Sequence, residues 1–270
     1  KYLNYINTYK KTFRSDKMQL NLTLQANGPV QLPIQYNHLV QGFIYQSMDN
    51  PLLRKYLHEH GFLFEKRRFK LFTFSRLMGQ KAHFHQKKKG LTLTPPLHLL
   101  ICSPIPFILQ ELGTGLLRQG RVRLGRTQLE VSQIEINSPK VSQGRIAVRM
   151  FSPLTVYSTL PSIEGRNYTY YYTPFEPRFG ELVHANLIKK YKLIHGSPPP
   201  EKHFAIEPLN ITEKDHKVTS YKNFIIKGWM GDYKLHGDPG LLQVALNAGL
   251  GAKNSQGYGC CVLKNSKTKE

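Results

Sequence analysis

A glycine-rich segment near the end of the chain has residue types that suit phosphate binding. It reads GLGAKNSQGYG, with glycines at Gly249, Gly251, Gly257 and Gly259. Glycine lets the backbone adopt positive φ angles and approach another group closely. Backbone N–H groups exposed by such a turn, with the Lys253 ammonium beside them, suit a phosphate. Because the segment follows a predicted helix and precedes a predicted strand, a helix C-cap with a tight turn also explains the glycines.

The standard nucleotide-binding motifs do not fit this segment. A Walker A loop needs Gly-Lys-Ser/Thr, whereas Lys253 is followed by Asn254. A dinucleotide fingerprint needs a third glycine where Asn254 stands, and it opens a helix instead of following one. We therefore expect no nucleotide cofactor.

The charge of the chain favours a polyanionic ligand. Among its 270 residues, 38 Lys+Arg face 17 Asp+Glu, which gives a net charge of +21. Such an excess opposes compaction through self-repulsion, so a nucleic acid is the first candidate and an anionic membrane the second. The charge is concentrated in a stretch without carboxylates, whose nine basic residues are Lys66, Arg67, Arg68, Lys70, Arg76, Lys81, Lys87, Lys88 and Lys89. We expect one basic face from the first half of the chain.

Other site chemistries lack the necessary residues. His83 and His85 would lie on one side of a strand, as metal ligands do, but no acid or cysteine nearby completes a set. The three cysteines, Cys102, Cys260 and Cys261, make neither a disulfide framework nor a four-cysteine zinc site. Sparse carboxylates disfavour a two-metal nuclease, and no nucleophile elbow is present. We expect no metal and no cofactor.

A membrane location is not expected either. No run of about 18 apolar residues is present, and no basic leader precedes an apolar stretch. The single tryptophan, Trp229, falls in a predicted strand and not in an amphipathic helix. We expect a cytoplasmic protein with reduced cysteines.

The first half of the chain alternates strand and helix patterns. Residues 1–17 are polar and basic, and we expect them to be an N-terminal extension. The pattern then predicts a strand at 19–25, helices at 39–48 and 51–61, strands at 69–75 and 97–102, a helix at 104–119 and a strand at 121–124.

The second half repeats this order more loosely. Strands are predicted at 129–136, 145–157, 204–211, 224–230 and 258–263, and helices at 175–191 and 239–248. Two tandem ferredoxin-like domains of the βαββαβ (RRM-like) type account for the order, which makes the fold class α+β. We predict a first domain over 18–127 and a second, carrying the glycine-rich segment, over 128–270.

In this context the chain resembles the CRISPR-associated repeat-RNA-processing endoribonucleases, the Cas six family of the RAMP superfamily. Their glycine-rich loop has the form G-h-G-x5-G-h-G, where h is apolar, and it closes a basic chain of two ferredoxin-like units. Four further segments fall in the family's order, namely YNH at 36–38, QGFIY at 41–45, YLHE at 56–59 and KLFTFS at 70–75. The resemblance spans residues 18 to about 264.

The resemblance implies a metal-independent cleavage of precursor CRISPR RNA within each repeat. The 2′-OH attacks the adjacent phosphate, leaving 2′,3′-cyclic phosphate and 5′-OH ends. The family's tyrosine, histidine and lysine map onto Tyr45, His58 and Lys70. Histidine suits proton transfer and lysine suits stabilisation of the developing charge. His60 is a second candidate for the histidine role, and the segment 62–69 makes the position of Lys70 less certain than that of His58.

RNA contacts are expected from basic and polar side chains spread over the chain. The residues that we predict to bind RNA are Arg67, Arg68, Lys87, Lys88, Lys89, Arg121, Arg123, Lys253 and Ser255, together with the four loop glycines. Aromatic side chains that could stack on unpaired bases are Phe84, Tyr168, Tyr170, Tyr171 and Tyr172.

The main alternative is a non-catalytic protein that binds repeat RNA within a CRISPR ribonucleoprotein. The presence of His58 argues against it, since the family members that bind without efficient cutting have lost this histidine. The expected partner in both cases is CRISPR repeat RNA. Homodimerisation and association with other Cas proteins stay open.

Overall fold

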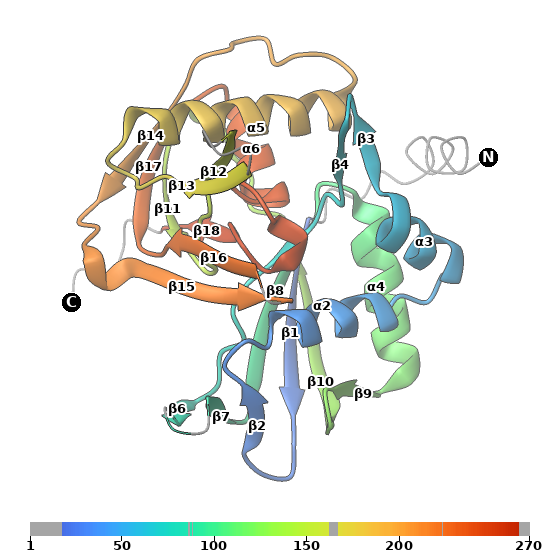
Figure 1. Cartoon of the computed structure of the whole chain (residues 1–270). Helices are drawn as coiled ribbons and strands as arrows, with labels where there is room; N and C mark the ends of the chain where they lie inside the picture. Colours follow the sequence, from blue (N-terminus) through green and yellow to red (C-terminus); the bar gives the residue numbers. More distant parts are fainter. Residues whose placement is uncertain (1–17, 86, 88, 162–166, 223, 265–270) are drawn as a thin grey trace.

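The computed structural model describes residues 18–264 except 86, 88, 162–166 and 223. The predicted extension over 1–17 and the predicted RNA-binding residue Lys88 lie outside the described residues. Within them, the chain forms two antiparallel sheets with helices on one side of each, and several separate hairpins. Figure 1 shows the N-terminal half in blue to green and the C-terminal half in yellow to red.

The N-terminal half contains an antiparallel five-stranded sheet in the order β5-β8-β1-β10-β9. Its strands are β1 (Gln19–Gln25), β5 (Thr73–Phe74), β8 (Leu97–Cys102), β9 (Arg121–Leu124) and β10 (Thr127–Asn137). The helices are α2 (Asn37–Gln46), α3 (Pro51–Lys55), which continues into the π-helical turn η1 (Tyr56–His60), and α4 (Pro106–Gln119). Strands β5, β8, β1 and β10 occupy the four positions of a ferredoxin-like sheet, and β9 extends its edge.

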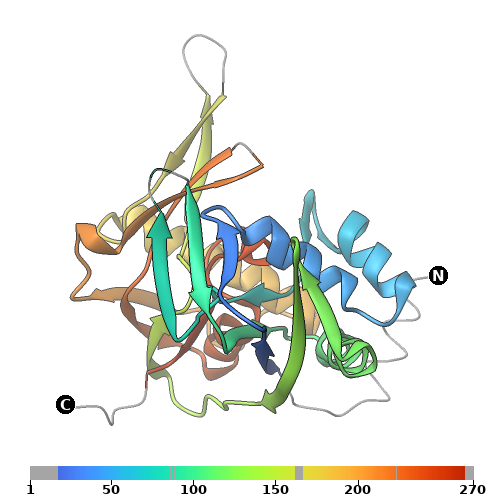
Figure 2. The same ribbon diagram turned by 90° about the horizontal axis from the view of Figure 1, so that it is seen from below.

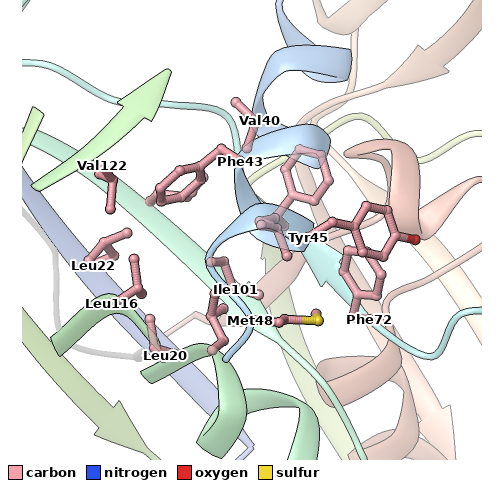
Figure 3. Packing of buried hydrophobic residues seen from close by; sticks show 14 of the residues in the cluster. Leu20, Leu22, Val40, Phe43, Tyr45, Met48, Phe72, Ile101, Leu116 and Val122 are labelled. Atoms are coloured by element: carbon pink, nitrogen blue, oxygen red, sulfur yellow. The ribbon is translucent and has the colours of Figure 1, made fainter. Parts of the chain in front are cut away.

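The core of this half explains the position of α2. Leu20 and Leu22 alternate along β1 and are buried against Phe43 of α2 and Leu116 of α4 (Figure 3). Tyr45 lies at the margin of this core, with its hydroxyl turned away from the aliphatic side chains (Figure 3). The same packing that fixes α2 therefore directs the Tyr45 hydroxyl away from the aliphatic core, although the side chain is buried.

Two strands differ from their predictions. Strand β10 pairs with β1 over seven residue pairs, so assigning the 129–136 strand to the second unit is wrong. The cause is the hairpin at Gly125, which turns β9 back and makes β10 the fourth strand of the first sheet. The predicted strand 69–75 is also interrupted: Leu71 has a φ of 52°, and only Thr73–Phe74 pairs with β8.

The C-terminal half contains a four-stranded sheet in the order β14-β17-β11-β18. Its strands are β11 (Arg145–Met150), β14 (Phe204–Leu209), β17 (Asp232–Gly237) and β18 (Cys261–Leu263), and its helices are α5 (Pro177–His195) and α6 (Pro239–Ala248). This is again the ferredoxin-like order, which confirms the prediction of two tandem units. Buried Leu100, Cys102 and Cys260 form a cluster between the halves.

Separate small sheets complete the fold. They are β2 (Val30–Pro33) with β6 (Lys81–His85) and β7 (Gly90–Thr94), and the hairpins β3 (Phe62–Phe64) with β4 (Arg67–Phe69), β12 (Tyr157–Pro161) with β13 (Asn167–Tyr171), and β15 (His216–Tyr221) with β16 (Phe224–Trp229). Figure 2 shows β6–β7 in teal, β12–β13 in yellow and β15–β16 in orange, all directed to the same side. None of the helices among the described residues has the length and apolar character needed to cross a membrane.

Candidate nucleic-acid interface and active site

The glycine-rich segment forms a loop between α6 and β18, with the short helix η3 (Asn254–Gln256) in its middle. All four of its glycines have positive φ angles, between 62° and 85°. A Cβ atom on Gly251 would lie 2.5 Å from the Thr155 carbonyl oxygen, and one on Gly259 would lie 1.9 Å from that of Leu250. The glycines are therefore required by the backbone path as well as by its φ angles.

The loop is held against the N-terminal half by side chains of α2 and β5. The Asn37 Nδ2 group donates to the Gln256 carbonyl at 2.9 Å, and Gln41 Nε2 donates to that of Ser255 at 2.5 Å. The Thr73 hydroxyl donates to the Tyr258 carbonyl at 3.0 Å. Two elements that carry predicted site residues, α2 and the loop, are thus fixed relative to each other.

The structure brings Tyr45, His58 and Lys70 together. The Tyr45 and His58 rings contact edge to face, with centroids 5.3 Å apart. The Lys70 ammonium donates to the backbone carbonyl of His58 at 2.9 Å. Helix α2, the π-helical turn η1 and the segment after β4 each supply one of the three. Lys70 is therefore close to His58 despite the intervening hairpin β3–β4.

Two of the three side chains, Tyr45 and His58, border an open cleft of about 570 Å³. They line it together with His38, Gln41, Arg54, Lys55 and Tyr221 among others. His60 is absent from this lining and lies 3.7 Å from Glu59, measured between Nε2 and Oε2. This placement favours His58 over His60 as the residue that reaches a ligand in the cleft. We call it the histidine cleft.

Burial shifts the pKa values of Tyr45 and Lys70. It raises the pKa of the Tyr45 hydroxyl, and nearby Tyr221 adds to the effect. Tyr45 is therefore a hydrogen-bond donor at neutral pH and not a base. Burial also lowers the pKa of Lys70, and the neighbouring Arg68 guanidinium lowers it further.

A second and larger cleft, of about 690 Å³, lies between the hairpin β3–β4, helix α5 and the glycine-rich loop. We call it the lysine cleft, because its lining contains six basic side chains: Arg67, Arg68, Lys70, Lys189, Lys190 and Lys253. No carboxylate belongs to the described residues that line it. Ser255 and Gly251 also line this cleft. Lys70 contributes to its wall while its ammonium contacts His58, so it joins the two clefts.

The remaining predicted RNA-binding residues lie elsewhere. Arg121 and Arg123, with Arg126, line a third cleft of about 450 Å³ beside the end of α2. Gln46 lines both this cleft and the histidine cleft. Lys87 and Lys89 lie in the turn between β6 and β7.

The aromatic side chains that were predicted to stack on bases differ in their exposure. Phe84, Tyr168 and Tyr170 have exposed fractions of 59%, 50% and 40%. Tyr171, by contrast, packs against Tyr157, with ring centroids 5.7 Å apart. Tyr170 packs on Tyr172, with ring centroids 4.8 Å apart, and its hydroxyl donates to Glu176 Oε2 at 3.0 Å. Phe84 on β6 and Tyr168 on β13 are therefore the more accessible rings of this group.

The histidine pair at His83 and His85 does occupy one side of a strand. The rings lie 4.9 Å apart, and His85 Nε2 is 2.8 Å from the Thr92 hydroxyl. Across the described part of the chain, no three His, Cys, Asp or Glu side chains come together as a metal site would require.

Lys190 is a site residue that sequence reasoning missed. Its ammonium is buried and donates to oxygens of the glycine-rich loop. In the sequence it is one of two adjacent lysines, Lys189 and Lys190, in an amphipathic helix, and only the helical phase distinguishes the buried one. Gln41 and Asn37 belong to segments that were noted, but their contacts to the loop depend on tertiary structure.

Two family models match consecutive parts of the chain. Residues 31–135 match the N-terminal model of CRISPR-associated protein Cas6, and residues 136–263 match the C-terminal model. The CRISPR-associated endoribonuclease Cas6 of Pyrococcus furiosus is 28% identical over 254 residues, covering 88% of this chain and 86% of its own. CRISPR-associated endoribonuclease Cas6 1 of Methanocaldococcus jannaschii is 27% identical over 266 residues, covering 94% and 97%.

Solved structures of related proteins have the same fold. A CRISPR-associated protein Cas6 aligns with a TM-score of 0.73 and 26% identity, over 92% of this chain and all of the other. A Cas6-related protein from Pyrococcus furiosus aligns with a TM-score of 0.79 at 18% identity, over 93% and 100%. A structure described as a RAMP protein binding different RNA substrates aligns with a TM-score of 0.77 at 19% identity, over 92% and 100%. At these last two identities the likeness concerns the fold.

Proposed function

Since this chain belongs to the Cas6 family of CRISPR-associated proteins, we propose that it is an endoribonuclease that cleaves precursor CRISPR RNA within its repeats. The observation that carries the proposal is the contact of Tyr45, His58 and Lys70 at the point where the histidine cleft meets the lysine cleft. A polyanion bound in the lysine cleft would bring its phosphates to Lys70 and, next to it, to His58.

The proposed reaction is an internal transesterification. The ribose 2′-oxygen forms a bond to the adjacent phosphorus, and the bond from phosphorus to the 5′-oxygen of the next nucleotide breaks. One proton leaves the 2′-OH and one reaches the 5′-oxygen. The products are a 2′,3′-cyclic phosphate and a 5′-OH. Because the nucleophile belongs to the substrate, side chains that move protons and stabilise charge are sufficient, and no metal-bound water is required.

Each of the three residues has a role suited to its surroundings. His58 is the proton-transfer group, because an imidazole both accepts and donates protons at neutral pH. Lys70 supplies positive charge to the developing phosphorane. Tyr45 donates a hydrogen bond, since burial keeps its hydroxyl protonated.

RNA binding is assigned mainly to the lysine cleft. Arg67, Arg68 and Lys253 supply charge there without an opposing carboxylate. Lys253 Nζ lies 5.1 Å from the centroid of Tyr157, which makes a cation–aromatic pair at the wall of the cleft. Arg121 and Arg123 form a second basic region, reached from the histidine cleft past Gln46. Self-association and binding to other Cas proteins stay predictions.

The test is cleavage of a matched repeat RNA in EDTA, with the end groups of the products identified. The unmodified chain is compared with His58→Ala, with His60→Ala as the matched control, and with a substrate that carries 2′-deoxyribose at the cut. We expect cyclic phosphate ends, a loss of cleavage in His58→Ala or with the deoxy substrate, and cleavage retained in His60→Ala. Tight binding without any cut by the unmodified chain would instead make it a repeat-RNA-binding protein.

A further inference from the structure

Lys190 is a fully buried lysine in the C-terminal part of helix α5. Its exposed fraction is 2%, and it ranks among the largest fully buried side chains. Burying an ammonium group is costly unless every N–H finds an acceptor. A lysine at this position therefore needs an explanation in its contacts.

The three acceptors of Lys190 all belong to the glycine-rich loop. Its Nζ atom lies 2.7 Å from the Gly249 carbonyl oxygen, 3.2 Å from that of Gly251 and 2.7 Å from Asn254 Oδ1. These contacts satisfy all three donors of the ammonium. None of the acceptors is a carboxylate, so the charge has no ion-pair partner among them.

Asn254 connects Lys190 to both ends of the glycine-rich loop through hydrogen bonds. With its Oδ1 turned to Lys190, Asn254 directs Nδ2 to the carbonyl of Leu250 at 2.9 Å and to that of Tyr258 at 3.0 Å. One amino group thus orients an amide that links the start of the loop to its end. The loop residues Gly251, Lys253 and Asn254 form a wall of the lysine cleft.

The burial of Lys190 disfavours its charged form. Burial lowers its pKa to about 7. A titratable group that interacts with it is the Cys261 thiol on β18. Burial raises the pKa of that thiol, which is therefore neutral near pH 7. The other charged groups of the cleft are cations, including Lys70, Lys189 and Lys253. Among the described residues that line the cleft, no negative charge offsets the burial of the Lys190 ammonium.

We propose that Lys190 is a positioning residue for RNA binding, whose amino group holds the glycine-rich loop in the shape that lines the lysine cleft. The inference rests on the proposed function, because it takes RNA as the ligand of that cleft. RNA phosphates in the cleft favour the protonated form of Lys190, so binding of RNA is coupled to uptake of a proton there.

The test measures repeat-RNA affinity at pH 6 and pH 8 in a His58→Ala background, which separates binding from cleavage. Lys190→Met is compared with Lys192→Met, an exposed lysine two positions along α5 whose replacement removes the same charge. We expect Lys190→Met to weaken binding about tenfold at pH 6, and the loss of affinity from pH 6 to pH 8 to be about threefold smaller than in the background protein. Lys192→Met should retain both the affinity, within about twofold, and the pH dependence.

The outcomes separate the two proposals. If the His58→Ala background does not bind repeat RNA at all, the proposed function fails. If it binds and Lys190→Met matches Lys192→Met in affinity and in pH dependence, the inference about Lys190 is overturned.

Hydrogen exchange of segment 249–259 in the unmodified chain covers the case in which Lys190→Met does not fold. Opening of the loop would return the Lys190 pKa from about 7 towards its ordinary value of 10.5, so protonation favours the open form. After correction for intrinsic exchange rates, protection of the loop should rise about tenfold from pH 6 to pH 8. Protection that does not change with pH contradicts the inference.

Discussion

The histidine cleft and the lysine cleft meet at Lys70 but differ in chemistry. The histidine cleft is lined by the N-terminal half and by Tyr221 and Lys222, and contains groups of several kinds: two imidazoles, two phenols, two amides, one carboxylate and three cations. The lysine cleft is built from both halves, and the described residues that line it include cations but no carboxylate. Mixed groups suit proton transfer, whereas uniform positive charge suits a polyanion of any sequence. In the proposed function, the histidine cleft is the region for cutting and the lysine cleft is the region for binding.

The two regions also depend on the fold in different ways. Tyr45 and His58 are placed by α2 and η1, which pack on the core of a single ferredoxin-like unit. The lysine cleft depends on a loop of the second unit that is held by Asn37 and Gln41 of the first. Damage to the loop should therefore affect binding and the docking of the halves together.

The largest effect is expected from Gly259→Ala. The added Cβ would lie 1.9 Å from the Leu250 carbonyl oxygen, and the φ of 72° disfavours any side chain. We expect the free energy of unfolding to fall by about 3 kcal/mol or more and RNA binding to be lost. Gly28→Ala is the matched control, since no atom lies within 4 Å of its added Cβ. Denaturant unfolding of both variants measures the difference, and equal stabilities would remove the steric argument.

A smaller effect, confined to binding, is expected from the double variant Arg67→Ala, Arg68→Ala. Two lost phosphate contacts should weaken RNA affinity about tenfold and reduce the salt slope of log K by about 1.4 for a single strand. The cleavage rate at saturating protein should stay within about threefold. Removing Arg178 and Lys192, two charges on α5 that lie outside both clefts, is the control. An unchanged salt slope would show that the lysine cleft does not bind the RNA backbone.

The third expected effect is gradual and concerns the pH dependence of stability. The Lys190 pKa is about 7 in the folded chain and has an ordinary value of 10.5, so between these values the unfolded chain holds more protons. The free energy of unfolding should therefore rise with pH by about 1.4 kcal/mol per unit from pH 7 to 9. Above the ordinary thiol value of 9.0, the raised pKa values of Cys260 and Cys261 oppose the rise.

This slope is measured by denaturant unfolding at several pH values. At each pH, the free energy of unfolding of Lys190→Met is subtracted from that of the unmodified chain. The contributions of Lys70 and Lys253 cancel in that difference. Parallel curves for the two proteins would mean that Lys190 is not buried as a titrating group.

The sequence predicted the elements whose patterns are local. Strands β1, β8 and β9 and helix α6 have the bounds that alternation, helical spacing and flanking Pro and Gly indicate. The fold class followed from their order. The sequence could not show that β10 returns to β1, because strand pairing is a long-range choice between two sheets that both have room at an edge.

The candidate site was predictable as residue types but not as contacts. The resemblance pointed to Tyr45, His58 and Lys70, and their proximity required the structure because the hairpin β3–β4 separates the last two. Strands β6 and β15 were missed, since neither has a regular alternation of buried apolar side chains. Lys190 was missed because burial of a lysine leaves no trace in composition.

The central claim is that cutting and binding belong to different clefts, and one paired measurement tests it most directly. Single-turnover cleavage and equilibrium binding are measured on the same repeat RNA for the unmodified chain, for His58→Ala and for Arg67→Ala, Arg68→Ala. We predict that His58→Ala lowers the cleavage rate at least about a hundredfold with affinity within about twofold. The arginine variant should weaken affinity about tenfold and keep the cleavage rate at saturating protein within about threefold. Parallel loss of rate and affinity in both variants would contradict the account.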